Sequence, residues 1–105
     1  MVVSGKDERL NIRPGVSITV PAEGVLLTPG ADVTITAEPV DYDGTVALVE
    51  FFQGETKLGE AFSEPYEIIW SGPSEGTYSI TARATDNGGA VNTSYPVTVT
   101  VSTSL

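Results

Sequence analysis

Two short segments of the chain carry side chains suited to binding a cation. Asp41-Tyr42-Asp43-Gly44 supplies two carboxylates, and Asp86-Asn87-Gly88-Gly89 supplies one carboxylate and one amide. Ca²⁺ takes about six to eight oxygen ligands, so these oxygens would have to meet in space. The same residue types also cap their own turns by accepting backbone hydrogen bonds, so both interpretations stay open. The candidate Ca²⁺ ligands are Asp41, Asp43, Asp86 and Asn87.

Aromatic side chains are the second group that could bind a ligand, because exposed rings offer flat apolar surfaces. Trp70 is the only tryptophan, and it shares its alternation with Tyr66 and Ile68. That spacing predicts a buried indole. The aromatic residues with better prospects of exposure are Tyr42, Phe52 and Phe62.

Composition excludes several classes of function. The chain has no histidine and no cysteine, which rules out Ser-His-Asp and Cys-His catalysis and a histidine-ligated zinc site. Its 14 acidic and 5 basic residues give a net charge of −9, which repels nucleic-acid phosphates and anionic lipids. No apolar run is long enough to span a membrane. We expect a non-enzyme that requires no cofactor and binds neither nucleic acid nor membrane.

The elements that must position these side chains read as short strands separated by turns. The clearest is 77–85, where Tyr78, Ile80, Ala82 and Ala84 alternate with polar residues. The last predicted strand places Tyr95 on one face with three valines. No helical period competes with this pattern. The seven predicted strands are 16–20, 32–38, 45–53, 56–58, 65–70, 77–85 and 92–102.

Seven one-sided apolar strands bury their stripes best as two antiparallel sheets packed face to face. A closed barrel is the alternative. The 105 residues suit one domain. Residues 1–15 read as a linker that ends in Pro14-Gly15, and residues 16–103 form the predicted sandwich. Residues 1–13 lack the apolar run of a signal peptide, so we expect any secretion signal to lie outside this sequence.

The sandwich gives the acidic segments a common position. In this topology the loops after the second and sixth strands emerge at the same end, which would bring 41–44 and 86–89 together. Tyr78, two residues after Gly76, resembles a tyrosine corner, which is a structural feature. Asn92-Thr93-Ser94 is a glycosylation sequon that matters only in a host that modifies such sites.

Three segments resemble a known family. They are Val16-Ser-Ile-Thr-Val-Pro-Ala-Glu-Gly24, Asp41-Tyr-Asp-Gly-Thr-Val-Ala-Leu-Val-Glu-Phe-Phe52 and Gly76-Thr-Tyr-Ser-Ile-Thr-Ala-Arg-Ala-Thr-Asp-Asn-Gly-Gly89. Their order and spacing are similar to the bacterial Ig-like modules repeated in secreted and surface proteins of bacteria and archaea. The resemblance implies a seven-stranded immunoglobulin-like, or fibronectin-III-like, β-sandwich. It also implies one module among several, beside adhesive, enzymatic or polysaccharide-related domains.

These observations favour a non-catalytic spacer module of an extracellular or cell-surface protein. Its partners would be the neighbouring domains of the same chain, and the isolated module would be a monomer. Two alternatives stay open. One is an adhesion module that binds surface polysaccharide or protein through exposed aromatic residues. The other is a Ca²⁺-dependent module that holds the ion between its two acidic loops.

Overall fold

The computed structural model describes residues 13–41 and 44–103, and within them the chain forms nine strands. Among these residues no helix has the length and apolar character needed to cross a membrane. The strands are β1 (Gly15–Val20), β2 (Leu26–Leu27), β3 (Val33–Val40), β4 (Val46–Gln53), β5 (Thr56–Ala61), β6 (Glu67–Trp70), β7 (Gly76–Asp86), β8 (Val91–Thr93) and β9 (Val97–Val101).

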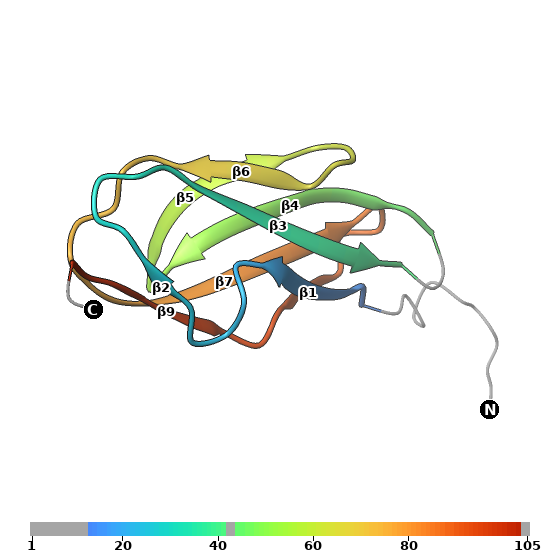
Figure 1. The fold of residues 1–105 in the computed structure, drawn as a ribbon. Coiled ribbons are helices and arrows are strands. Elements are labelled where there is room, and N and C mark those ends of the chain that lie inside the picture. The colour runs from blue at the N-terminus through green and yellow to red at the C-terminus, as the bar shows by residue number, and fades with distance from the viewer. Residues whose placement is uncertain (1–12, 42–43, 104–105) are drawn as a thin grey trace, which may run out of the picture.

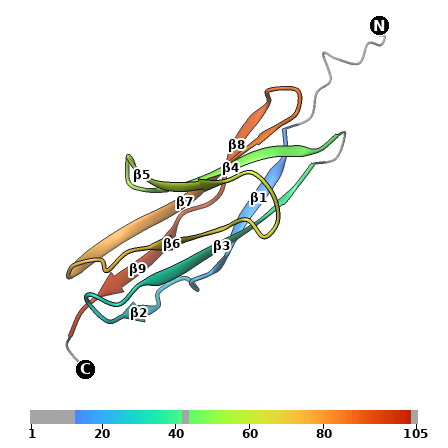
Figure 2. The same cartoon turned by 90° about the horizontal axis from the view of Figure 1, so that it is seen from above.

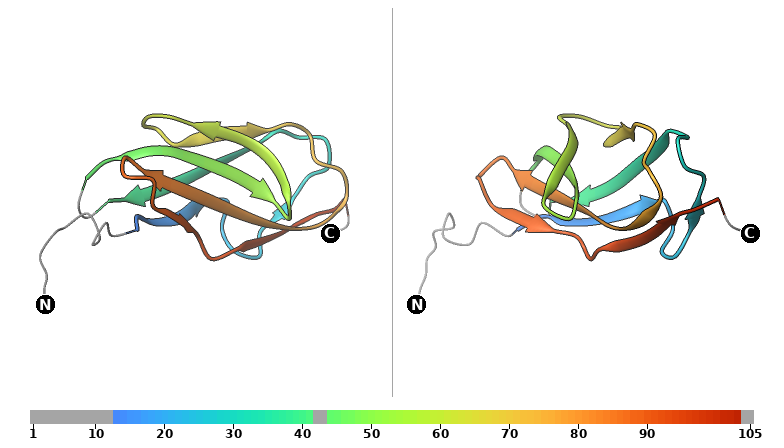
Figure 3. Two further views of the ribbon diagram at one scale, coloured as in Figure 1. Left: turned by 180° about the vertical axis from the view of Figure 1, so that it is seen from behind. Right: turned by 90° about the vertical axis from the view of Figure 1, so that its left-hand side faces the viewer.

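The strands form two sheets that pack face to face (Figure 1). One sheet has the order β1-β3-β6. The other has the order β2-β9-β7-β4-β5. In this second sheet, β9 pairs with the first part of β7 and β8 pairs with its last part. Figure 3 shows the same two layers from behind and from one end. The predicted fold class, an immunoglobulin-like all-β sandwich, is confirmed.

Alternation along the strands builds the core between the sheets. In β7 the side chains of Ile80, Ala82 and Ala84 are fully buried, and the residues between them face outward. The same pattern in β3 buries Ile35 and Ala37. The remaining buried apolar side chains of the cluster are Val33, Val49, Phe51, Trp70 and Val99.

The predicted positions of the tryptophan and the tyrosine corner are both confirmed. Trp70 retains 8% of its surface, and its ring meets that of Tyr78 edge to face at 4.9 Å between centroids. The Tyr78 hydroxyl donates a 2.8 Å hydrogen bond to the carbonyl of Ser74, four residues upstream. The pair therefore fastens the turn before β7 to the core.

One prediction about the last strand is wrong. Tyr95 is 93% exposed, although simple alternation placed it beside Val97 in the core. Arg83 lies opposite Thr93 and Ile80 lies opposite Val97, so three steps along β7 face four steps along the last strand. The extra residue is a β-bulge, and it divides the predicted strand into β8 and β9 and turns Tyr95 outward.

The first strand departs from its prediction at both ends. Alternation places Val20 on the same face as Val16 and Ile18. Val20 is instead 47% exposed, because the register shifts by one residue between Ile18 and Val20. At the other end, Pro14 is buried and Gly15 lies opposite Val40. These last two linker residues therefore take part in the sandwich, which begins slightly earlier than the boundary at Val16.

Candidate functional site

The described residues of the two acidic segments, Asp41 and Gly44 of the first and 86–89 of the second, lie at the same end of the sandwich, as the topology predicted. The backbone nitrogen of Asn87 donates a 2.9 Å hydrogen bond to the Thr45 carbonyl, and the side-chain Oδ1 of Asn87 accepts a 3.1 Å bond from the Thr45 backbone amide. Gly44 packs against the same side chain so closely that a Cβ there would lie 2.5 Å from Asn87 Oδ1. Asn87 is thus a latch between the β3–β4 connection and the β7–β8 turn.

Asp86 organises the turn that carries this latch. Its side chain is 2% exposed, and Oδ1 accepts hydrogen bonds from the amides of Gly88 (2.9 Å) and Ala90 (2.8 Å). These are the contacts of a carboxylate that caps its own turn. Of the four candidate Ca²⁺ ligands, Asp86 and Asn87 therefore lie in this turn, and both make hydrogen bonds to backbone amides.

The other two candidate ligands are placed differently. Asp41 follows β3 and is half-buried, and Asp43 lies outside the described residues. Within the described residues, no three histidine, cysteine, aspartate or glutamate side chains form a group able to hold a metal ion. Ca²⁺ binding by Asp41, Asp43, Asp86 and Asn87 stays a prediction, and the geometry of Asp86 is that of turn capping.

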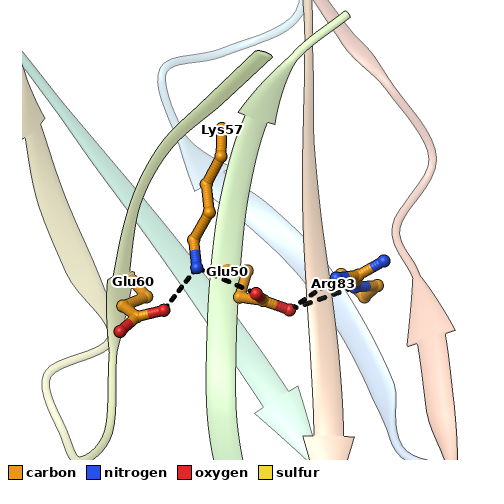
Figure 4. Close-up of polar contacts among 4 residues, drawn as sticks. All are labelled: Glu50, Lys57, Glu60 and Arg83. Carbon is orange, nitrogen blue, oxygen red and sulfur yellow. Dashed lines mark hydrogen bonds and ion pairs between the residues drawn. The ribbon is translucent and has the colours of Figure 1, made fainter. Parts of the chain in front are cut away.

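A second polar cluster lies on the outer face of the larger sheet, on β4, β5 and β7 (Figure 4). Glu50 Oε1 accepts hydrogen bonds from Arg83 Nε (3.1 Å) and Nη2 (2.8 Å), and its Oε2 accepts one of 2.9 Å from Lys57 Nζ. Lys57 also pairs with Glu60. We call Glu50, Lys57, Glu60 and Arg83 the ion-pair cluster.

The electrostatics of the ion-pair cluster follow from its geometry. Burial raises the pKa of Glu50, but the hydrogen bonds from Lys57 and Arg83 and the charges of both bases outweigh it, so the pKa lies below its ordinary value. Hydrogen bonds to Glu60 and Glu50 raise the pKa of Lys57. Glu50 and Lys57 are therefore each held in the charged form, which suits a structural role.

The cluster escaped prediction because strand register is needed to find it. The alternation marked Glu50 and Arg83 as outward, but only the pairing of β4 with β7 places one opposite the other. Phe52, an expected exposed aromatic, is half-buried, and the Arg83 guanidinium lies 5.1 Å from its ring centroid. This cation–π contact explains why an aromatic residue stands beside Glu50 on the solvent side of β4.

Phe62 and Tyr42 are the other two aromatic residues that were predicted to face solvent. Phe62 is 65% exposed in the β5–β6 connection, and Tyr42 lies outside the described residues. Tyr95, which is more exposed than Phe52 or Phe62, was missed because its bulge was not foreseen. The sequon residue Asn92 is half-buried, and its Nδ2 donates a 2.9 Å hydrogen bond to the Pro14 carbonyl.

An open groove of about 630 Å³ runs along the end of β3 and holds two carboxylates, Glu38 and Glu64. Tyr66 and two prolines provide its apolar lining. Both glutamates are exposed to solvent. The groove therefore lacks the water-excluded setting that paired carboxylates need for acid–base chemistry on a glycoside.

Comparison with solved structures agrees with this architecture. The fibronectin(III)-like modules of Clostridium thermocellum CbhA are 29% identical, with a TM-score of 0.80 over 86% of this chain and 98% of that chain. The PKD1 domain of the Vibrio cholerae metalloprotease PrtV is 24% identical, with a TM-score of 0.63 over 88% and 100% of the two chains. This second likeness concerns the fold alone.

An endo-beta-1,4-mannanase from Thermotoga petrophila also contains a similar fold, at 13% identity and a TM-score of 0.66. The similarity covers 89% of this chain but 20% of that enzyme, so it carries no inference about activity. No curated protein matches the chain. The sequence model described as "Bacterial Ig domain" matches residues 14–82, which is 69 of the 105 residues. The chain therefore belongs to the bacterial Ig domain family, the immunoglobulin-like and fibronectin-III-like modules of bacterial multidomain proteins.

Proposed function

We propose that this chain is a non-catalytic spacer module that holds neighbouring domains of an extracellular or cell-surface protein apart. One observation carries the proposal: the described chain begins and ends at opposite ends of the sandwich (Figures 1 and 2). At the start of the described chain, the Pro14 carbonyl accepts a hydrogen bond from Asn92, which lies opposite Ala84 of β7. At its end, Val101 lies opposite Gly76 of β7. Eight residue steps of β7 separate these points, which is about 26 Å.

The strand arrangement suits a module under tension. β2 and β9 run parallel, and both run from the Pro14 end toward the Val101 end. The two segments are joined by the pairing of Leu26–Leu27 with Thr100–Val101. Backbone hydrogen bonds around this pairing include Gly24 N to Thr98 O, Thr100 N to Val25 O and Ser102 N to Leu27 O. Pulling the two chain ends apart would slide these segments past each other, so the bonds would be loaded together rather than one at a time.

Composition and family resemblance support the rest of the proposal. The chain lacks histidine and cysteine, and its charge of −9 favours solubility over binding to polyanions. The family resemblance to modules of secreted and surface proteins supports an extracellular position. Its partners under this proposal are the adjoining domains, and surface polysaccharide or protein would be bound by other parts of the parent protein.

The test is single-molecule stretching through introduced cysteines, which label cleanly because the chain has none of its own. Pulling between Arg13→Cys and Thr103→Cys should require a higher unfolding force than pulling between Glu55→Cys and Thr103→Cys. The second pair lifts the β4–β5 hairpin and breaks its bonds one after another. Equal forces along both axes would remove the support for a spacer.

A binding screen tests the non-binding part of the proposal. The isolated chain would be measured against bacterial and plant polysaccharides and extracellular matrix proteins by calorimetry. We expect no dissociation constant at or below about 1 μM, near −8 kcal/mol. A ligand bound that tightly would make the chain a binding module instead.

A further inference from the structure

The β7–β8 turn contains a chemically labile pair, Asn87-Gly88, and both residues are exposed. Asparagine is among the thermolabile residues of proteins. In an Asn-Gly pair the backbone nitrogen of the glycine can attack the asparagine Cγ. The Cγ–Nδ2 bond breaks, ammonia leaves, and a cyclic imide forms. Water then opens the ring to aspartate or to isoaspartate, in which the chain continues through the side-chain carbonyl.

In the folded protein, hydrogen bonds hold both reacting groups, the Gly88 nitrogen and the Asn87 side chain. The nucleophile, Gly88 N, donates its hydrogen to Asp86 Oδ1 at 2.9 Å. This charge-assisted bond keeps the nitrogen protonated and therefore unreactive. The electrophile is also held, because the side-chain oxygen Asn87 Oδ1 accepts a hydrogen bond from the Thr45 backbone amide. The backbone amide of Asn87 donates to the Thr45 carbonyl and holds the main chain in place beside it. The side chain is thus fastened toward the neighbouring loop.

We propose that Asn87 is a site of spontaneous deamidation that the fold keeps closed, so that modification occurs only when the β7–β8 turn separates from Thr45. The native rate then equals the rate in the unfolded chain multiplied by the fraction of time the turn is open. Asn87 is exposed to water throughout, so its exposure does not limit the reaction. The latch does.

Deamidation would leave the latch permanently weakened. Isoaspartate adds one backbone methylene to a turn whose length is set by the Asp86 cap and the Thr45 pairing. Gly44 already lies against the Asn87 side chain, so a displaced side chain has no space on that side. The product also adds a negative charge beside the buried Asp86 carboxylate in a chain that carries −9. The modified turn therefore stays detached from the β3–β4 connection.

The experiment follows deamidation of the whole chain by intact mass and by isoaspartate-specific peptide mapping. One sample is kept native and the other in guanidinium chloride, at the same pH and temperature. We expect the native rate to be lower by about tenfold or more, as local opening requires. Equal rates would overturn the proposal. A faster native rate would also overturn it, because Asp86 would then act as a base toward Gly88 N.

Two variants separate the chemistry from the latch. Gly88→Ala hinders attack and should suppress the reaction in both samples; Gly88 is not among the glycines with positive φ, so alanine fits its backbone. Gly44→Ala places a Cβ against Asn87 Oδ1 and should raise the native rate toward the denatured rate. An unchanged native rate in a folded Gly44→Ala protein would contradict the latch. If that variant does not fold, the comparison of native and denatured wild type decides the question by itself.

Discussion

Glu50→Gln is the substitution that most directly tests the ion-pair cluster. Glutamine keeps the volume of the side chain and one acceptor oxygen but removes the charge. Glu50 is 13% exposed, and it is the acceptor that joins Lys57 to Arg83 across three strands (Figure 4). After the substitution Lys57 still has Glu60, whereas Arg83 loses its anionic partner and keeps its contact with Phe52 and a neutral acceptor at position 50.

The expected loss of stability depends on how far Glu50 and its two basic partners are buried. Hydrogen bonds to a charged group contribute about 1.5–3 kcal/mol, and fully exposed ion pairs contribute about 0.2–1 kcal/mol. Glu50 is largely buried, but the side chains of Lys57 and Arg83 are 40% and 43% exposed. We therefore expect a loss of about 1–2 kcal/mol in the free energy of unfolding. In a domain of this size each kcal/mol lowers Tm by about 4–8 °C.

The pH dependence gives the prediction a second signature. The pKa of Glu50 is lowered on folding from its ordinary value of 4.5, so the folded protein binds its proton less tightly than the unfolded chain does. The stabilisation is therefore present above pH 4.5 and is lost as the pH falls through the lowered folded value. The Tm difference between wild type and Glu50→Gln should be full at pH 7 and shrink toward acid pH.

Calorimetry between pH 7 and pH 3 measures both signatures. Glu55→Gln is the matched control, because Glu55 is exposed in the β4–β5 turn and belongs to none of the ion pairs found among the described residues. It removes the same charge from the chain and corrects for reduced overall repulsion. The reasoning fails if Glu50→Gln behaves like Glu55→Gln, or if its Tm difference does not change with pH.

Three further predictions address single contacts. Tyr78→Phe removes the hydrogen bond to the Ser74 carbonyl and should cost about 1 kcal/mol in urea unfolding; an unchanged midpoint would contradict the tyrosine corner. Ser94→Ala leaves the buried Ala82 amide without its hydroxyl acceptor and should cost about 1–3 kcal/mol, with no change in the m-value; a neutral result would mean that water replaces the hydroxyl. The calcium hypothesis predicts that millimolar Ca²⁺ shifts the NMR amide resonances of 86–89, and unmoved resonances would end it.

Sequence alternation predicted the faces of strands that pair without interruption. The inward and outward residues of β3 and β7 follow a strict period of two, so the core positions Ile35, Ile80, Ala82 and Ala84 could be read directly. Trp70 was placed for the same reason. Backbone twist and chain connectivity then made two packed sheets the natural way to bury these stripes.

Alternation failed where one strand has an extra residue relative to its partner. Tyr95 and Val20 both lie next to a register shift, and each faces solvent although its period pointed inward. A bulge is a property of two strands, so one strand's pattern does not contain it. Pro96, which has no amide hydrogen for the ladder, was the local signal that the last strand is interrupted.

The candidate site was predicted in its position but not in its contacts. Topology alone placed the two acidic loops at one end, and the Asn87–Thr45 hydrogen bonds confirm that they meet there. The hydrogen-bond partners of the side-chain oxygens in these loops depend on the backbone conformation of each turn residue, which the topology does not specify. Asp86 Oδ1 accepts from its own turn, and that outcome was one of two that the residue types allowed.

The parallel β2–β9 segments and the Asn87-Gly88 turn lie at opposite ends of the sandwich, so a change in the turn need not affect the hydrogen bonds between these segments. The Asn87 latch closes the end where Pro14 begins the sandwich, whereas the parallel β2–β9 segments lie toward the Val101 end. Opening of the β7–β8 turn leaves the hydrogen bonds between residues 24–27 and 98–102 intact. A deamidated chain should therefore unfold at the same force as the unmodified chain when pulled between residues 13 and 103, while its Thr45 amide exchanges faster with solvent. A fall in unfolding force together with faster exchange would mean that the two ends are mechanically coupled through β7.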